Sequence, residues 1–421
     1  YADVSAAIDR AKAGDTVMVP AGKATWSSQL AISKGVNLIG AGAGKTIIEG
    51  AYAAPSTLST YTTNSLIYYN PGVPIGEHVF RLSGFTFNLH NKSGWIHVRH
   101  TASGNAAMRN FRIDHNAING TDGIHPDFRM IYVWGHVFGV IDNNTFNNVG
   151  STLGAYGLNE TTWNNMEFEF GTADNLYFED NTLTNLWGLP HSGGAGGRYC
   201  ARYNSYNQTE NSYFQVFDMH GNQGPGSNLS TMGAEIYGNT IVRSNTGTYG
   251  TRLFDHRGGK ALIYNNSITA ESGTPSCTPR EEYIDTSTPP ASAAVSGQPQ
   301  HVSESYYWKN KNNGFDIGTS AYEITGTVDY SVGQIVDGKA YPPAAPYRVV
   351  PQWDLDCWRQ TPVFDGSSGV GVGLLSERPS SCAREGVAYW ATDTETLYRW
   401  KQRAWEAYYT PYPYPHPLRS R

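Results

Sequence analysis

A six-residue pattern, repeated along the first two thirds of the chain, constrains the fold more than any other feature of the sequence. Each copy reads apolar, variable, variable, usually Asn, small, apolar. The copies lie at residues 82–87, 113–118, 141–146, 178–183, 201–206, 236–241 and 263–268. From Asn116 onward, the Asn returns after 28, 37, 23, 35 and 27 residues. Self-similarity at periods of this length is typical of solenoids, in which each repeat forms one coil.

The chemistry of the repeat predicts how a coil is built. Asn tolerates the left-handed backbone that a tight turn needs, and Asn side chains stacked in successive coils can hydrogen-bond along the solenoid. The flanking apolar residues would point into a shared core, so only the whole stack is stable. Further segments alternate with period two, as strands do, at residues 95–100, 130–134, 166–170, 214–218 and 251–255. We therefore predict an all-β protein, a right-handed parallel β-helix.

The two ends of the chain differ from the repeats. A short amphipathic helix near the N-terminus would cap the solenoid, so that residues 1–15 form the cap and residues 16–330 the β-helix. Residues 331–421 form an irregular region, with a hairpin predicted at residues 387–404. The Tyr- and Pro-rich segment 409–417 cannot be helical. We expect it to lie extended along the solenoid or to dock on a neighbouring molecule.

The composition argues against two classes of partner. The net charge is −6 and no basic run is present, whereas binding of nucleic acid needs clustered Lys and Arg. No apolar stretch approaches the ~20 residues of a membrane span. Charged residues make up only 16% of the chain, and the 28 Tyr and 11 Trp suit either a large core or a surface that stacks on sugar rings.

The start of the chain and its cysteines bear on where the protein works. The chain begins at Tyr1 without a Met, and we expect a trimmed product of a secreted precursor, located outside the cell. The four cysteines form no Cys-x-x-Cys pair, which argues against zinc-ribbon and thioredoxin-type sites. A secreted setting permits disulfides, and a bond between Cys357 and Cys382 would close a local loop.

The repeats, the N-terminal helix and the segment Gly40-Ala41-Gly42 together resemble the pectate-lyase-like superfamily of right-handed parallel β-helix proteins, over roughly residues 3–270. Residues 111–115, Phe-Arg-Ile-Asp-His, are similar to the Trp-Ile-Asp-His segment of pectate lyases. That superfamily includes pectate and alginate lyases, polygalacturonases, phage tailspikes and non-enzymatic surface proteins. The resemblance implies a polysaccharide partner and leaves the activity open.

Carboxylates recur two positions before the ladder Asn. Along the stack this position is occupied by Asp114, Asp142, Glu179, Arg202, Tyr237 and Tyr264. Alternation along a strand points this column outward, and coils stacked at ~4.8 Å would place the three acids at a spacing that suits Ca²⁺. By analogy with uronate lyases, Arg202 would remove the C5 proton of the substrate. The alternative is a solvated acidic stripe without a ligand.

Two similar strings, Phe217-Asp218-Met219-His220 and Phe254-Asp255-His256-Arg257, suggest a second cluster. In consecutive coils they would bring the two Asp residues together, with both His residues and the Arg close by. Paired acids with His and Arg are suited to general acid–base hydrolysis of a glycosidic bond. The alternative is a turn in which these side chains satisfy backbone groups.

Two functions follow from these patterns. One is a secreted carbohydrate-active protein, a lyase or hydrolase of an acidic polysaccharide with calcium as the cofactor. The other is a non-catalytic extracellular protein with a structural or adhesive role, such as a filament or tailspike-like subunit. The hairpin and the Tyr/Pro-rich tail favour the second, because such segments could support self-association through the C-terminal region.

Overall fold

The computed structural model describes most of the chain outside a set of connections. The described residues are 1–52, 65–71, 80–89, 95–99, 107–120, 129–157, 168–186, 188–208, 215–221, 230–243, 252–271, 276–279, 302–317, 335–336, 339–340 and 356–421. The predicted boundary between residues 330 and 331 lies outside them. Within the described part, no helix is both long and apolar enough to cross a membrane.

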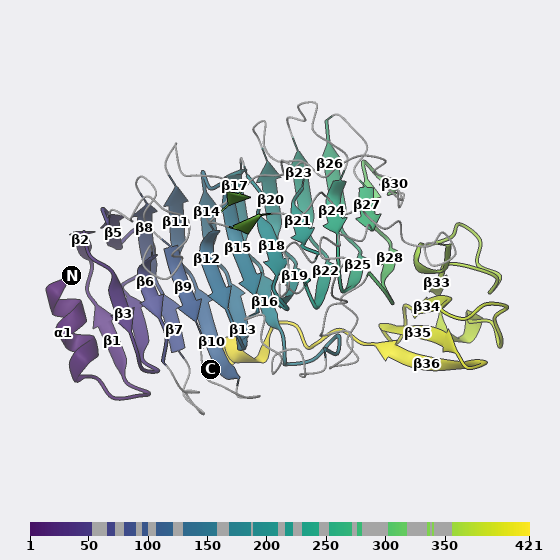
Figure 1. The fold of residues 1–421 in the computed structure, drawn as a ribbon, viewed down its shortest axis with the longest axis horizontal. Helices are drawn as coiled ribbons and strands as arrows, with labels where there is room; N and C mark the ends of the chain where they lie inside the picture. The colour runs from purple at the N-terminus through teal and green to yellow at the C-terminus, as the bar shows by residue number, and fades with distance from the viewer. Residues whose placement is uncertain are drawn as a thin grey trace.

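Three long sheets wind along the chain, one strand of each per coil (Figure 1). Sheet A contains β1 (Thr16–Val19), β4 (Asn37–Gly40), β7 (Phe80–Ser83), β10 (Met108–Asp114), β13 (Val137–Asp142), β16 (Leu176–Glu179), β19 (Arg198–Arg202), β22 (Gly233–Tyr237), β25 (Lys260–Tyr264) and β28 (Tyr306–Trp308). Sheet B contains β2 (Gly22–Trp26), β5 (Thr46–Gly50), β8 (Phe85–Leu89), β11 (Ala117–Gly120), β14 (Thr145–Asn147), β17 (Thr182–Leu186), β20 (Ser205–Gln208), β23 (Thr240–Arg243), β26 (Ser267–Ala270), β29 (Lys311–Asn312) and β30 (Phe315–Asp316). Sheet C contains β3 (Leu30–Ile32), β6 (Ser65–Tyr69), β9 (Trp95–Arg99), β12 (Arg129–Trp134), β15 (Ser151–Tyr156), β18 (His191–Gly194), β21 (Phe217–Met219), β24 (Arg252–His256) and β27 (Ser276–Pro279).

The prediction of an all-β parallel solenoid is confirmed. Neighbouring strands within sheets A and C pair in parallel, and sheet B is parallel until the antiparallel pair β29–β30. The inward residues of the three sheets form one apolar core, in which rings such as Phe217 and Phe254 stack at 5.3 Å. One predicted strand is wrong: of residues 166–170, the first two lie outside the described residues and the rest are not strand. That coil instead uses β15 in sheet C.

The asparagine ladder is present at the turn from sheet A to sheet B. The Oδ1 atom of Asn144 accepts from the backbone N–H and the side-chain amide of Asn116, at 3.0 and 3.1 Å. The same pair of bonds repeats along the chain through Asn181, Asn204, Asn239, Asn266 and Asn310.

The left-handed residue of this turn is not the Asn itself, contrary to the expectation from the sequence. It is the preceding residue, which has φ near +55° at His115, Asn143 and Asp180. From β10 onward, this turn always has two residues between the strands, one left-handed and one ladder Asn. Its length therefore stays constant while the spacing of the repeats varies.

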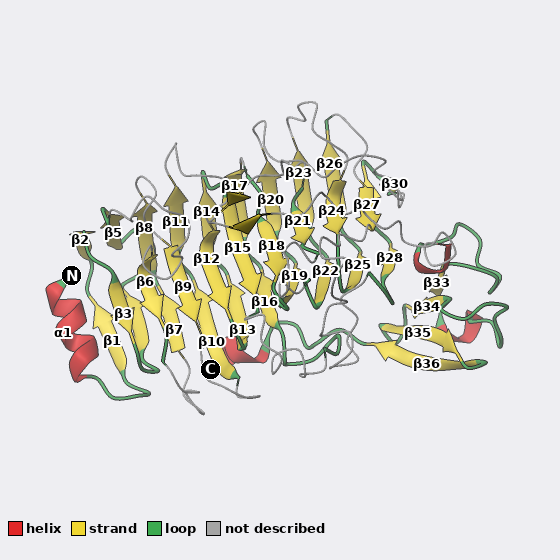
Figure 2. Cartoon of the chain, in the orientation of Figure 1, coloured by secondary structure: helices red, strands yellow, loops and turns green. Residues whose placement is uncertain are grey.

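The ends of the solenoid are covered by different elements (Figure 2). Helix α1 (Ala2–Arg10) buries Ile8 at the N-terminal end, close to the predicted helix. At the other end, β33 (Val370–Gly373), β34 (Ala388–Ala391), β35 (Thr396–Lys401) and β36 (Ala404–Tyr409) form a four-stranded sheet. The predicted hairpin is the antiparallel pair β34–β35. Trp390 of this sheet packs 5.3 Å from Trp308 of the last sheet A strand.

Two smaller predictions about the C-terminal region have opposite outcomes. Residues 409–421 run back along the solenoid from the end of β36, as expected for the Tyr- and Pro-rich tail, and end in the 3₁₀ helix η2 (Pro417–Ser420) (Figure 1). The predicted disulfide is wrong, because neither Cys357 nor Cys382 forms a disulfide bond. The Sγ atom of Cys357 faces the carbonyl oxygen of Glu385 at 3.7 Å instead.

Candidate functional site

The acidic column of sheet A is aligned as the repeat predicts. Strand pairing places Asp114, Asp142, Glu179, Arg202, Tyr237 and Tyr264 side by side on successive strands. The alignment holds despite loops of very different length, because the ladder turn fixes each strand end relative to its neighbours.

The expectation that this column is open to solvent is wrong. The side chains of Asp114, Asp142, Glu179 and Arg202 are all 0% exposed. Residues 409–421, here called the C-terminal strap, lie over Asp142, Glu179 and Arg202. The guanidinium of Arg202 donates to the carbonyl oxygens of Tyr412 and Pro413 at 2.7 and 2.9 Å. The repeat alone could not predict this burial, because the covering segment lies more than 200 residues away in the sequence.

Arginines neutralise the acids of the column. The ion pairs are Arg81–Asp114, Arg112–Asp142 and Arg202–Glu179, with N···O distances of 2.5, 2.9 and 2.6 Å. Burial alone would raise the pKa of Asp114, but hydrogen bonds from Arg81 and His115 and the charge of Arg112 hold that pKa below its usual value. Among the described residues, no three His, Cys, Asp or Glu side chains converge as metal ligands. Calcium binding stays a prediction.

The second cluster lies on the outer face of sheet C. Asp218 on β21 and Asp255 on β24 are cross-strand partners, as their similar sequence contexts suggest. Arg257 makes two bonds to Asp218, at 2.8 and 2.6 Å, and lies 3.7 Å from Asp255. The Nε2 atom of His220 is 2.8 Å from Asp218. Both acids and Arg257 are buried, and His220 is half-buried.

Arg257 and His220 together surround Asp218. The Nη2 atom of Arg257 contacts Nδ1 of His220 and lies 3.2 Å from its Nε2, so the guanidinium, the imidazole and the carboxylate form one compact group. Burial would raise the pKa of Asp218, but the charges of Arg257 and His220 lower it well below its usual value. Asp218 is therefore an ionised carboxylate that has no proton to give to a leaving group.

His256 does not join this cluster, although the sequence suggested it. It follows Asp255 directly in β24, and alternation turns it into the core. There its ring nitrogens lie 2.7 Å from the hydroxyl of Tyr307 and 3.0 Å from the carbonyl oxygen of Gly259. Burial lowers the pKa of His256 to about 4, so the ring is neutral at ordinary pH.

An aromatic row on the same face was not predicted. Tyr68, His97, Tyr132, Trp134 and Tyr156 lie on the outward side of β6, β9, β12 and β15. Tyr68, Trp134 and Tyr156 are partly exposed, whereas His97 and Tyr132 are buried. The successive contacts Tyr68–His97, His97–Tyr132 and Tyr132–Tyr156 have ring centroids 5.3, 5.2 and 5.3 Å apart. Tyr132 and Trp134 meet edge to face at 5.7 Å. The strand alternation in β12 could have revealed part of this row, since its apolar inward residues flank Tyr132.

Arginines and small residues complete the face. Arg99 lies over the ring of Trp134 at 5.2 Å, and Arg129 lies over that of Tyr156 at 5.5 Å. The next strands present small residues in the same columns, namely Gly154, Ser192 and Gly194. A Cβ atom on Gly154 would lie 2.6 Å from Cδ2 of Tyr132, so the glycine leaves room for the ring. The small residues therefore lie between the row of rings and the Asp218 cluster on the same face.

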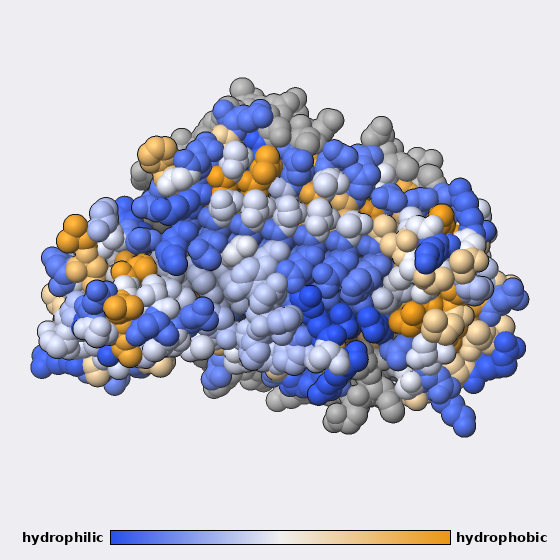
Figure 3. All heavy atoms as spheres, turned by 180° about the vertical axis from the view of Figure 1, so that it is seen from behind, coloured by the Kyte–Doolittle hydropathy of each residue, from blue (hydrophilic) through white to orange (hydrophobic). Residues whose placement is uncertain are grey.

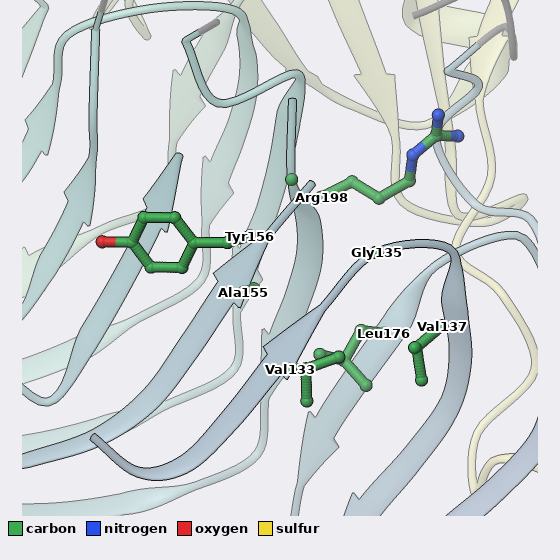
Figure 4. Close-up of a pocket in the computed structure, with 8 residues that line it drawn as sticks. Val133, Gly135, Val137, Ala155, Tyr156, Leu176 and Arg198 are labelled. Carbon is green, nitrogen blue, oxygen red and sulfur yellow. The ribbon is translucent and has the colours of Figure 1, made fainter. Parts of the chain in front are cut away.

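Cavities do not mark a deep substrate pocket in the described part of the chain. The cavity of Figure 4 lies between Val133, Val137, Tyr156 and Arg198 and has a volume of about 10 Å³, room for roughly one water. A second hollow of about 140 Å³ lies beside the strap, lined by Arg109, Phe138 and other residues. Seen from behind, the middle of the molecule is polar, and apolar residues are scattered toward its edges (Figure 3).

Comparison with known proteins adds little to this site. No protein-family model matches the chain, and no curated protein matches its sequence. Among solved structures, ORF18 of Geobacillus virus E2 is similar over 96% of this chain and 82% of that chain, with 11% identity and a TM-score of 0.30. A similarity at this TM-score says nothing about function, so the function must be inferred from the residues of this chain.

Proposed function

We propose that the protein works outside the cell and binds an acidic polysaccharide along the outer face of sheet C. The observation that carries this proposal is the row of rings on the outer face from Tyr68 to Tyr156, in which Tyr68, Trp134 and Tyr156 are partly exposed and His97 and Tyr132 are buried between them. Aromatic rings are normally used to fill a core. Partly exposed rings on the outside of a solenoid, next to the partly exposed Arg99 and the buried Arg129, suit a ligand that is both ring-shaped and charged.

The contacts of the two arginines support an anionic ligand. Arg99 and Arg129 lie over the rings of Trp134 and Tyr156, and these cation–π contacts help to position both guanidinium groups. Arg129 also donates to the hydroxyls of Tyr156 and Ser192, at 3.1 and 3.2 Å. A planar guanidinium fixed in this way suits a carboxylate or sulfate of a glycan. Neutral glycans would use the rings alone.

Catalysis has weaker support than binding. The lyase role proposed for Arg202 requires an open column, but its guanidinium is buried beneath the strap. Hydrolysis by Asp218 and Asp255 is the second candidate, favoured by their position on adjacent strands at the end of the row, although both carboxylates are buried as well. Asp218 is ionised and would act as nucleophile or base, with Asp255 as the other carboxylate of the pair. An adhesive role without catalysis needs only the binding face.

Binding is tested by removing one ring of the row. Trp134→Ala should weaken binding to an acidic polysaccharide such as pectate, alginate or hyaluronan by ~10-fold or more, because one stacked ring contributes on the order of 1 kcal/mol beyond its area. The matched control is Tyr398→Ala, which removes a ring under Arg378 in the C-terminal sheet, 4.2 Å from the guanidinium. Equal loss in both variants, or none in Trp134→Ala, would contradict the proposal.

Catalysis is tested on the same polymers by the products formed. Hydrolysis yields new reducing ends, and Asp255→Asn should abolish them. Elimination yields an unsaturated product that absorbs in the ultraviolet, and its appearance would restore Arg202 as the candidate base. Binding that is lost in Trp134→Ala, without either product, would establish the adhesive function.

A further inference from the structure

We propose that the outer face of sheet A is a docking groove for an extended peptide, and that the strap, residues 409–421, is its own built-in ligand. The groove is defined by Arg112, Asp142, Glu179, Asp180 and Arg202. The strap crosses the strands of sheet A instead of pairing with them, since no strand follows Tyr409 in the described residues. The contact is therefore a recognition of one chain segment by another surface, independent of the polysaccharide proposal.

The groove recognises the peptide backbone of the strap. Arg202 donates to the carbonyl oxygens of Tyr412 and Pro413 at 2.7 and 2.9 Å. Farther along, Arg112 donates to the carbonyl oxygen of Arg419 at 3.1 Å. Glu179 accepts the backbone N–H of His416 at 2.9 Å. These charge-assisted bonds hold an extended chain at three points.

Side chains of the strap fit specific places on the groove. The rings of Tyr412 and His416 lie 5.1 and 4.9 Å from the ring of Tyr177. The ring of Tyr414 lies 4.1 Å from that of Tyr203. The hydroxyl of Tyr414 donates to both carboxylate oxygens of Asp180, at 2.8 and 2.9 Å. These contacts would give the groove a preference for aromatic residues at fixed positions.

The charges of the groove and strap are complementary. Without the strap, four carboxylates (Asp114, Asp142, Glu179 and Asp180) face three guanidinium groups (Arg81, Arg112 and Arg202), an excess of one negative charge. Arg419 supplies the missing positive charge. Its guanidinium lies 3.0 Å from Glu179 and 3.3 Å from Asp142, and it also binds Asp180. A ligand of this groove therefore needs a cation near its C-terminal end.

The length of the strap matches the span of the groove. Its contacts begin at Tyr264 on β25, whose hydroxyl is 3.0 Å from that of Tyr409, and end at Arg112 on β10. Five inter-strand steps separate these strands, ~24 Å at the usual spacing. Seven residue steps from Tyr409 to His416 can extend to ~23 Å, and the three steps to Arg419 in the 3₁₀ helix η2 add ~6 Å. The strap is therefore long enough to touch every coil between.

The groove can be tested in the full-length chain with a labelled peptide of residues 409–421. Tyr412→Ala with Arg419→Ala weakens the tethered strap, and the peptide should then bind in trans. Binding to the wild type should be at least ~10-fold weaker, because the tethered strap competes at an effective concentration on the order of millimolar. Fluorescence anisotropy measures both affinities.

A change in the groove separates specific docking from adhesion. Asp180→Asn, added to the strap-weakened chain, should reduce peptide affinity by ~10-fold, because it removes a charged partner of Arg419 and Tyr414. The fold should tolerate this change, since Asp180 is partly exposed and has φ +53°, a conformation that Asn accepts well. A scrambled peptide is the control for composition.

Hydrogen exchange on the unmodified chain gives an independent measurement. The amides of His416 and Leu418 are bonded to Glu179 and to the His416 ring, and both should be protected. The proposal is overturned if these amides exchange as in an unstructured peptide. It is also overturned if the peptide does not bind the strap-weakened chain, binds it no better than wild type, or ignores Asp180→Asn.

Discussion

Replacing Glu179 by Gln tests the buried ion-pair column most directly. The substitution keeps the shape of the side chain and removes its charge. Glu179 is 0% exposed and receives bonds from Arg202 at 2.7 Å, the backbone N–H of His416 at 2.9 Å and Arg419 at 3.0 Å. Gln is neutral and can accept at only one side-chain oxygen, so Arg202 and Arg419 both lose this anion, while Arg419 keeps Asp142 and Asp180.

The magnitude follows from the burial of the partner left behind. Arg202 has no exposed side-chain surface, so water cannot replace the lost carboxylate. Breaking a buried ion pair by removing one partner destabilises a protein by about 3–5 kcal/mol. The matched control is Asp174→Asn, which breaks the Arg109–Asp174 pair. Those side chains are 47% and 37% exposed, and such a pair contributes about 1 kcal/mol or less.

Urea denaturation followed by tryptophan fluorescence measures both variants. We expect the unfolding midpoint to fall clearly for Glu179→Gln and to change little for Asp174→Asn, with similar slopes. The difference should appear in the rate of unfolding as well, if the strap has already detached at the transition state. Two variants with equal losses, or a loss below ~1 kcal/mol for Glu179→Gln, would refute the view that the column is a buried, saturated network.

Three further outcomes are expected. His191, His256 and His416 are buried, which lowers their pKa values to about 3, 4 and 3, below the ~6.5 of the unfolded chain. The stability that they contribute is therefore present above pH 6.5 and is lost as the pH falls toward 4. A melting temperature that does not fall between pH 7.5 and 4.5 would contradict this. If calcium binds the folded acids, millimolar Ca²⁺ should raise the melting temperature, more so in Arg419→Ala, where the competing cation is gone; no shift in either chain would end the calcium prediction. Gly154→Ala should disturb Tyr132 and Arg129, whose atoms lie 2.6 and 2.9 Å from the new Cβ, and weaken polysaccharide binding with a small effect on melting, whereas unchanged binding would remove this face from the proposed site.

The sequence predicts the coils of the solenoid but not the position of the C-terminal strap that covers sheet A. The ladder Asn residues from Asn116 to Asn266 appear in the repeat, and the strand period alone aligns Asp114 with Asp142 and Glu179. The burial of that column depends on residues 409–421, which are distant in sequence and carry only a Pro-rich pattern. No local rule links that pattern to Arg202.

The aromatic row was missed for a different reason. The two strands that complete its face, β15 (Ser-Thr-Leu-Gly-Ala-Tyr) and β18 (His-Ser-Gly-Gly), lack a clear apolar alternation. Their identity as strands depends on parallel partners on both sides. Residues 166–170 alternate more clearly, and for that reason the sequence predicts a strand there, which is wrong. Likewise, His256 was grouped with Asp255 by proximity in sequence, although alternation separates adjacent residues in a strand.

The two-residue turn between sheets A and B has a consequence for where new binding specificity can arise. Because this corner cannot change length without breaking the ladder, insertions must occur at the other two corners. The connection from sheet C to sheet A ranges from two residues, between β12 and β13, to twenty-six, between β27 and β28. Sheets A and B each border one invariant corner, whereas sheet C is bordered by variable loops on both edges. Sequence drift can therefore remodel the rim of sheet C, coil by coil, while the spine of asparagines stays unchanged.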